Sequence, residues 1–209
     1  TMKTEEYPLG RRLYVYGSGR PLPERAQALL DFALSDAAQP LIAEAGFVGR
    51  DIEGQGIDVQ GARIANSLTS PEEFSLPLMR EMLTELKQAE RLSLTFRFNA
   101  GSSDLEARSQ SEAERFARLI AGGAFKDKEI LLVGFADSVG EFNVNRGLAE
   151  RRAQSVLDTL TATVGEAALA SVPIRVQSYG ELTPVGCNET AEGRELNRRV
   201  EVWVRDREQ

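Results

Sequence analysis

The sequence predicts an α/β fold in its C-terminal part, a two-layer sandwich in which helices pack on one mixed sheet. Three observations lead to this prediction. Apolar and polar residues alternate from Leu92 to Phe98, as in a half-buried strand. A continuous apolar run at 130–135 is typical of a central strand. Helical apolar repeats separate these segments from two further alternating runs, at 174–178 and 200–204.

Two helices complete the predicted order β-α-β-α-β-β. Ser109 and Glu112 form a capping pattern for the first helix, which Gly122 ends. The second helix covers about 142–162. Its apolar face is formed by Ala149, Ala153, Val156, Leu157 and Leu160. We therefore expect one four-stranded mixed sheet with both helices packed against it.

The first 50 residues predict a separate αβ fragment. Residues 12–16 are aromatic and β-branched, which favours a strand. Pro23 precedes a helical repeat that begins at Glu24, and a short helix is expected at 41–45, ending at Gly46.

Residues 51–90 are predicted to be a linker followed by one helix. Glycines are frequent from 49 to 70 and large apolar residues are few, which indicates a linker or a long loop. Gly54-Gln-Gly56 follows no clear strand and opens no helix, so it is not a dinucleotide fingerprint. A capping pattern at 70–73 predicts a helix that runs to about Glu90, with Pro77 in its first turn or at its true start.

The composition excludes several classes of function. The 209 residues carry a net charge of −7, which disfavours binding to nucleic acid. There is no histidine and only one cysteine, Cys187, so Ser-His-Asp or Cys-His nucleophiles, histidine-based zinc sites and internal disulfides are excluded. No apolar run approaches the ~20 residues of a membrane span, and we expect any export leader to be absent or removed. We expect no metal and no cofactor.

Four segments carry the strongest functional signal. They are Phe98-Asn-Ala-Gly-Ser-Ser-Asp-Leu105, Gly134-Phe-Ala-Asp-Ser-Val-Gly140, Asn145-Arg-Gly-Leu-Ala-Glu-Arg-Arg-Ala153, and Tyr179 to Asn188 continuing through Gly193-Arg-Glu-Leu-Asn-Arg-Arg-Val-Glu201. Together, over about residues 91–206, they resemble the OmpA-like peptidoglycan-binding domain, which also occurs in outer-membrane lipoproteins and flagellar stator proteins.

The resemblance implies a binding site for the free diaminopimelate end of uncrosslinked peptidoglycan stems. That group is a zwitterion, so a receptor needs a carboxylate near a guanidinium. The resemblance assigns the ligand ammonium to Asp137 and the ligand carboxylate to Arg152. From these two residues alone, a turn aspartate and a structural salt bridge would explain the pattern equally well.

The resemblance implies four further site residues. Asn145 and Arg198 border the pocket, although Asn145 could instead cap the second helix and Arg198 could pair with a surface glutamate. Asn99 and Gly101 belong to a loop that lines the pocket mainly through its backbone. Relatives often have Asp in place of Asn99 and Thr in place of Ala136, departures that bear on the tightness and selectivity of binding.

The N-terminal part has a second, shorter resemblance. The segments 7–16, 30–35 and 39–48 look like the C-terminal end of a phosphate-type periplasmic solute-binding protein. The alternative is an unrelated αβ extension. We expect a fusion in which 1–50 is the end of a solute-binding domain, 51–90 is a linker with a helix, and 91–209 is the wall-binding domain.

These observations predict a non-enzymatic module that anchors a solute-binding domain to peptidoglycan in the periplasm of a Gram-negative bacterium. The alternative is a phosphate-like solute receptor of a transporter, for which the wall domain is a passive tether. An enzyme would need a carboxylate pair or a Ser-Lys dyad in this histidine-free chain. The apolar face of 79–86 predicts docking on the C-terminal domain, and that of 26–33 predicts self-association through the N-terminal fragment.

Overall fold

The computed structural model describes residues 2–207 except 5, 8–9, 11–12, 17–18 and 70–74. It divides into two compact units, residues 1–53 and 54–209. The second unit contains the predicted sheet and every residue that the sequence assigns to the site.

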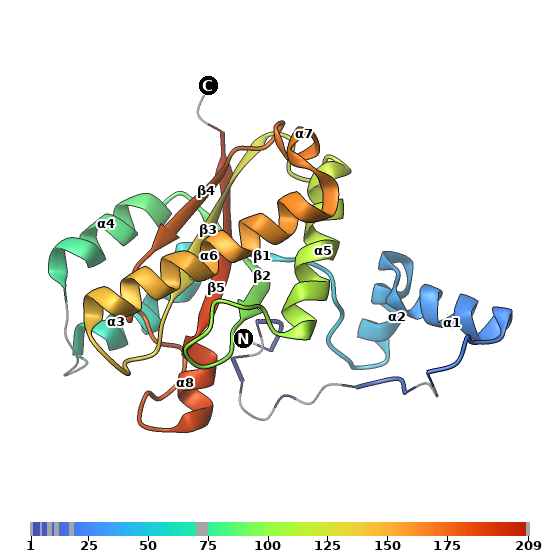
Figure 1. Cartoon of the computed structure of the whole chain (residues 1–209), viewed down its shortest axis with the longest axis horizontal. Coiled ribbons are helices and arrows are strands. Elements are labelled where there is room, and N and C mark those ends of the chain that lie inside the picture. Colours follow the sequence, from blue (N-terminus) through green and yellow to red (C-terminus); the bar gives the residue numbers. More distant parts are fainter. Residues whose placement is uncertain are drawn as a thin grey trace. The chain divides into compact units, whose positions relative to one another are not determined.

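One mixed five-stranded sheet forms the centre of the second unit (Figure 1). Its strands are β1 (Gly54–Gln55), β2 (Glu90–Arg97), β3 (Lys128–Phe135), β4 (Ile174–Ser178) and β5 (Arg199–Asp206). Their order in the sheet is β1-β2-β5-β3-β4, in which only β3 and β4 pair in parallel. The predicted α/β class is confirmed, and β1 is an addition to the four predicted strands.

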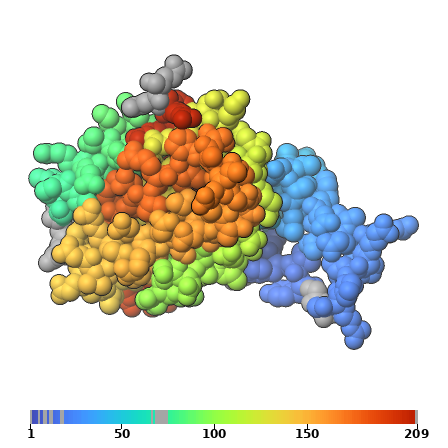
Figure 2. Space-filling view, turned by 45° about the horizontal axis from the view of Figure 1, so that its top comes forward, coloured from blue at the N-terminus to red at the C-terminus, as the bar shows by residue number. Residues whose placement is uncertain are grey.

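Two long helices, α5 (Ala107–Ala121) and α6 (Phe142–Val164), pack on one face of this sheet. Gly134 of β3 permits this close approach, because a Cβ at that position would lie 2.1 Å from the carbonyl oxygen of Ala149 in α6. A short helix, α7 (Glu166–Leu169), follows α6. Figure 2 shows α6, in yellow and orange, lying at the surface of this unit.

The opposite face of the sheet is covered by the segment that precedes β2. Helix α4 (Leu76–Leu86) packs its apolar side on β3 and β5, and Pro77 lies in its first turn, as one of the two predicted readings has it. The buried cluster consists of Leu78, Met79, Met82, Leu86, Ala89, Leu131, Val133, Phe135, Tyr179, Leu182 and Trp203. The predicted capping pattern at 70–73 lies outside the described residues.

The prediction of a linker at 49–70 is wrong for 54–69. Those residues form β1, a 3-10 turn (η2, Ile57–Gln60) and helix α3 (Gly61–Thr69). Ile57 and Ile64 pack against the cluster under α4. Two isoleucines and a few buried polar side chains suffice to hold the segment, which is why its composition resembles that of a loop.

The prediction that β2 is half-buried is also wrong. The side chains of Arg91, Ser93 and Arg97, on its polar face, are as inaccessible as the leucines and phenylalanines on the other face. They are buried because η2, α3 and α4 cover that side of the sheet. Their charges therefore need partners inside the protein.

The first unit contains α1 (Glu24–Leu34), η1 (Asp36–Ala38) and α2 (Gln39–Glu44), which confirms the two predicted helices. Gly46 follows α2 with a φ of 84°, a conformation that suits glycine at a helix end. The predicted strand at 12–16 is not formed at Leu13–Tyr16, where the rings of Tyr14 and Tyr16 contact each other instead. Arg12 lies outside the described residues.

Candidate functional site

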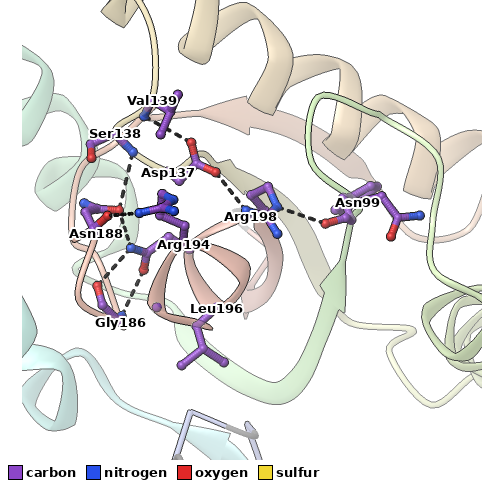
Figure 3. A network of polar contacts seen from close by, with 12 residues as sticks. Asn99, Asp137, Ser138, Val139, Gly186, Asn188, Arg194, Leu196 and Arg198 are labelled. Carbon is purple, nitrogen blue, oxygen red and sulfur yellow. Dashed lines mark hydrogen bonds and ion pairs between the residues drawn. The ribbon is translucent and has the colours of Figure 1, made fainter. Parts of the chain in front are cut away.

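Asp137 lies just beyond the end of β3, in the loop that leads to α6. Its Oδ1 accepts a hydrogen bond from the backbone N–H of Val139 at 3.1 Å. Its Oδ2 forms an ion pair with Nη1 of Arg198 at 3.0 Å (Figure 3). The two side chains are 15% and 13% exposed, so the pair lies at the edge of solvent.

Arg152 projects from the middle of α6 and is only 1% exposed. Its Nε donates to the carbonyl oxygen of Ser102 at 2.9 Å, and its Nη2 donates to that of Asn99 at 3.3 Å. The guanidinium carbon lies 5.5 Å from the centre of the Phe98 ring. Among the described residues, no carboxylate forms an ion pair with this guanidinium.

Burial lowers the pKa of Arg152 to about 10, although the nearby charge of Asp137 acts in the opposite direction. The positive charge of Arg198 lowers it further. Arg152 is therefore a desolvated cation whose main electrostatic support, Asp137, is already paired with a second cation. The charges of the site that act on Arg152 are thus one carboxylate, that of Asp137, and the guanidinium of Arg198.

Asn145 belongs to the first turns of α6 and is buried. Its Nδ2 lies 3.2 Å from the carbonyl oxygen of Asp137, 3.1 Å from that of Val139 and 2.7 Å from Oε1 of Glu181. It therefore holds the loop after β3 against α6. The residue at the N-cap of α6 is Glu141, so Asn145 is not the cap.

The loop after β2 contacts Arg152 through its backbone. The carbonyl oxygen of Asn99 accepts from Arg152, while the Asn99 side chain is exposed. Gly101 has a φ of 67°, which lets the chain turn back so that the Ser102 carbonyl also reaches Arg152. Direct contacts join the predicted residues in two groups, Asp137 with Arg198 and Asn145, and Arg152 with Asn99. Phe98 links the groups, because its carbonyl oxygen accepts from Arg198 and its ring lies beside Arg152, and Gly101 shapes the loop.

Asp137 and Arg152 do not form the structural salt bridge that the two residues alone could suggest. Asp137 forms its ion pair with Arg198, and Arg152 is held by backbone carbonyls. Arg198 also donates through Nε to the carbonyl oxygen of Phe98 at 3.3 Å. It joins the start of β5 to the loops that follow β2 and β3.

The segment between β4 and β5 supplies contacts that the sequence did not predict. It contains a short helix, α8 (Ala191–Asn197), whose N-cap Thr190 accepts from the N–H of Gly193 at 3.0 Å. Asn188 Oδ1 accepts from the N–H of Ser138 at 3.4 Å, next to Asp137 (Figure 3). Thr190, a residue type favoured at helix N-caps, is the feature of the sequence that could have predicted α8.

The described residues contain no cluster of three or more metal-ligating side chains. The polar groups described at the site are guanidiniums, amides and the carboxylates of Asp137 and Glu181. Such groups can bind a charged ligand through charge-assisted hydrogen bonds.

Residues 97–198 match the OmpA family. The match makes this part of the chain similar to OmpA-family domains, and all six predicted site residues lie within the matched range. The compact unit continues in the structure beyond the match, because β1 extends its sheet and α3 and α4 cover one face of it.

Among curated relatives, outer membrane porin F of Pseudomonas aeruginosa is 34% identical over 114 residues, or 54% of this chain and 31% of the relative. Outer membrane protein A of Bordetella avium is 41% identical over 75 residues, or 36% of this chain and 37% of the relative. The chain thus spans about a third of the length of these relatives.

Among solved structures, the C-terminal domain of Helicobacter pylori MotB is 28% identical. It aligns with a TM-score of 0.46 over 55% of this chain and 85% of that one. No helix in the described part of this chain is long and apolar enough to cross a membrane.

Proposed function

We propose that this protein binds peptidoglycan non-covalently through the free diaminopimelate group of stem peptides. The OmpA-like domain supplies the site and works in the periplasm of a Gram-negative bacterium. The matched relatives from Pseudomonas aeruginosa and Bordetella avium are named as outer-membrane proteins, which supports a place in the cell envelope.

The observation that carries the proposal is the state of Arg152. A guanidinium that is 1% exposed has lost its hydration, and backbone carbonyls neutralise none of its charge. A ligand carboxylate would supply the missing counter-charge in a partly desolvated setting. Charge-assisted hydrogen bonds of this kind contribute roughly 1.5–3 kcal/mol each.

Asp137 supports recognition of the ammonium that accompanies this carboxylate. Each of its oxygens makes one hydrogen bond or ion pair in the structure, to Val139 and to Arg198. A carboxylate offers about four acceptor positions, so room remains for an ammonium. The two cations and one anion of the site favour a ligand end that carries a full carboxylate.

Co-sedimentation of the full chain with isolated diaminopimelate-type sacculi tests the proposal. We expect Arg152→Lys to weaken binding at least tenfold, because lysine keeps the charge but cannot span the carbonyls and the ligand with one planar fork. Arg151→Lys is the matched control, since Arg151 is its exposed neighbour in α6. Unchanged sedimentation of Arg152→Lys would contradict the site assignment.

The same assay separates binding from hydrolysis. We infer a non-enzymatic anchor, so no soluble muropeptide should be released from the sacculi during incubation. Walls with lysine in place of diaminopimelate lack the second carboxylate and should sediment the protein weakly. Release of fragments by purified protein, absent from an Arg152→Lys preparation, would instead identify a wall hydrolase.

The wider role proposed for the protein is to tether a solute-binding domain to the wall. It is supported by the resemblance of residues 7–48 to the end of a phosphate-type solute-binding protein. Residues 1–53 form at most part of one lobe, and a solute cleft closes between two lobes. Calorimetry with inorganic phosphate should therefore show no binding to this chain. Micromolar binding would favour the alternative, a receptor with a passive wall tether.

A further inference from the structure

We propose that Arg63, in helix α3, is a positioning residue for the wall-binding site, acting through Glu201 and Arg199 on the loop that borders Asp137. Arg63 lies outside the residues that match the OmpA family. The inference rests on the proposed function for its consequence on binding, and its structural part can be measured without any ligand.

Glu201 is the centre of a buried charge cluster on the face of the sheet that α3 covers. Its carboxylate is 0% exposed and is bonded by Arg63 from α3 and by Arg199 from β5, both through Oε1. Arg91 of β2 and the indole N–H of Trp203 approach its Oε2 at 3.4 and 3.0 Å. Burial alone would raise the pKa of Glu201, but the three arginines hold it well below its usual value.

Arg199 transmits the position of Glu201 to the segment between β4 and β5. Its Nε donates to Glu201 at 2.7 Å, while its Nη2 donates to the carbonyl oxygen of Thr183 at 2.9 Å. Its guanidinium stacks on the ring of Phe135, with 4.1 Å between the guanidinium carbon and the ring centre. A planar fork held on three sides fixes the segment that it bonds.

The same segment is then tied to the candidate site by two asparagines. Asn197 Oδ1 accepts from the N–H groups of Val185 and Gly186 at 2.8 and 2.9 Å. Asn197 Nδ2 donates to Asn188 Oδ1 at 2.6 Å, and that oxygen also accepts from the N–H of Ser138, the residue after Asp137. Arg198, the ion-pair partner of Asp137, lies between Asn197 and Arg199 in the chain.

Loss of Arg63 should loosen this segment without detaching α3. Ile64 still packs against the cluster under α4, and Gln60 still accepts from Arg91. The carboxylate of Glu201 keeps Arg91 and Arg199 as partners. Without Arg63, it would shift toward these two arginines and away from α3. Arg199 would follow it, and the carbonyl of Thr183 would lose its fixed donor.

Amide hydrogen exchange on the ligand-free full chain tests the positioning role. In Arg63→Met we expect exchange at the amides of Val185 and Gly186 to be at least tenfold faster than in the wild type. Arg205→Met is the matched control, because Arg205 forms a comparable ion pair with Glu129 and a bond to the α4 carbonyl of Glu85 at the other end of β5. It should change these two amides less than twofold.

Affinity for sacculi tests the functional consequence. Arg63→Met should weaken binding three- to tenfold, Arg63→Lys should recover at least half of the wild-type affinity, and Arg205→Met should bind like the wild type. Unchanged exchange at Val185 and Gly186 in Arg63→Met would overturn the inference, whatever the wild type binds. If exchange is faster in Arg63→Met but the wild type does not sediment with sacculi, Arg63 still positions the segment between β4 and β5. That result would contradict the proposed function. Faster exchange with unchanged affinity would confine Arg63 to a structural role and overturn the proposal.

Discussion

Asp137 is held by its two oxygens in different ways, and this determines what its replacement should do. Oδ1 orders the turn through Val139, whereas Oδ2 carries the ion pair with Arg198. Asp137→Asn keeps an acceptor for the turn but removes the charge. A side chain at the edge of solvent contributes little to the core, so the fold should be retained.

We expect Asp137→Asn to reduce sedimentation with sacculi at least tenfold while changing the urea midpoint little. Removal of the carboxylate leaves Arg152 and Arg198 facing the ligand ammonium with no opposite charge. Asp158→Asn, on the exposed side of α6, is the control and should bind normally. An Asp137→Asn protein that pellets as well as the wild type would remove Asp137 from the site.

Glu201 should make the stability of the domain depend on pH. The three arginines hold the pKa of Glu201 below the ordinary value of a glutamate, about 4.3. Its contribution to stability is therefore fully present above that pH and is lost as the pH falls toward the folded value. Glu201→Gln leaves buried arginines uncompensated and should cost about 3–5 kcal/mol at pH 7. Urea unfolding of both proteins from pH 8 to 3 should show a constant difference above about pH 5 that shrinks below pH 4. A difference that grew on acidification would refute this account.

At the scale of residues, the motif spacing predicted a set of residues that lie near one another in the structure, but it did not predict which of them form ion pairs. Asp137 and Arg152 come near each other because Asp137 follows the end of β3 and Arg152 lies in α6, which packs on that strand. The choice of Arg198 as the partner of Asp137 depends on how β5 enters the sheet, which no local pattern specifies. The Arg63–Glu201 contact joins residues 138 positions apart, so no local sequence pattern could predict it either.

At the scale of elements, two glycines near the site have opposite meanings. Gly134 lies in β3 under α6, where a Cβ would meet the backbone of Ala149 at 2.1 Å. Gly147 lies in the interior of α6, and a Cβ there would meet only the end of the Arg151 side chain at 3.5 Å. Backbone cannot move aside as a flexible side chain can.

We therefore expect Gly134→Ala to lower the free energy of unfolding by about 3 kcal/mol or more, because α6 must shift away from the sheet. The melting temperature should fall accordingly. Gly147→Ala should raise stability by up to about 1 kcal/mol, since alanine is favoured over glycine inside a helix. Calorimetry on the two variants should show a loss of stability for Gly134→Ala and a gain for Gly147→Ala. Similar effects of the two substitutions would mean that α6 does not pack on β3 as closely as described.

The sequence predicted helices and strands correctly where the apolar repeat was regular. It missed the elements whose buried side chains are mainly polar. The long helices and the apolar strands follow from repeats of 3.6 and 2 residues. Residues 54–69 were missed because their contribution to the core consists of two isoleucines and a buried ion pair. The aromatic run at 13–16 has strand composition, but no neighbouring strand pairs with it in the described residues.

At the scale of the whole molecule, the N-terminal unit and the OmpA-like unit raise separate questions. None of the residues of α1 is buried, and Leu29 and Phe32 are 68% and 47% exposed. Self-association through this helix remains a prediction. Light scattering should give a larger species for 1–209 than for 54–209, whereas equal monomers would contradict it.

The division of the chain also predicts where the wall-binding domain can be cut. The family match begins at residue 97, and the sequence alone places the domain at 91–209. The structure places the boundary of the compact unit at residue 54. Between those positions lie α3 and α4, which cover Trp203, Leu131 and the charge cluster around Glu201.

We expect the fragment 54–209 to fold and sediment with sacculi like the full chain, and the fragment 91–209 to be unstable or aggregated. Removal of α4 exposes Leu131, Val133 and Trp203, and each large apolar side chain contributes roughly 1.5–3 kcal/mol when buried. Removal of α3 also takes Arg63 away from Glu201. Trp203 is the only tryptophan, so its emission reports this face directly and should shift to longer wavelength in 91–209. A shorter fragment with native emission, cooperative unfolding and full wall binding would show that α3 and α4 are dispensable, and the positioning role of Arg63 would then be wrong as well.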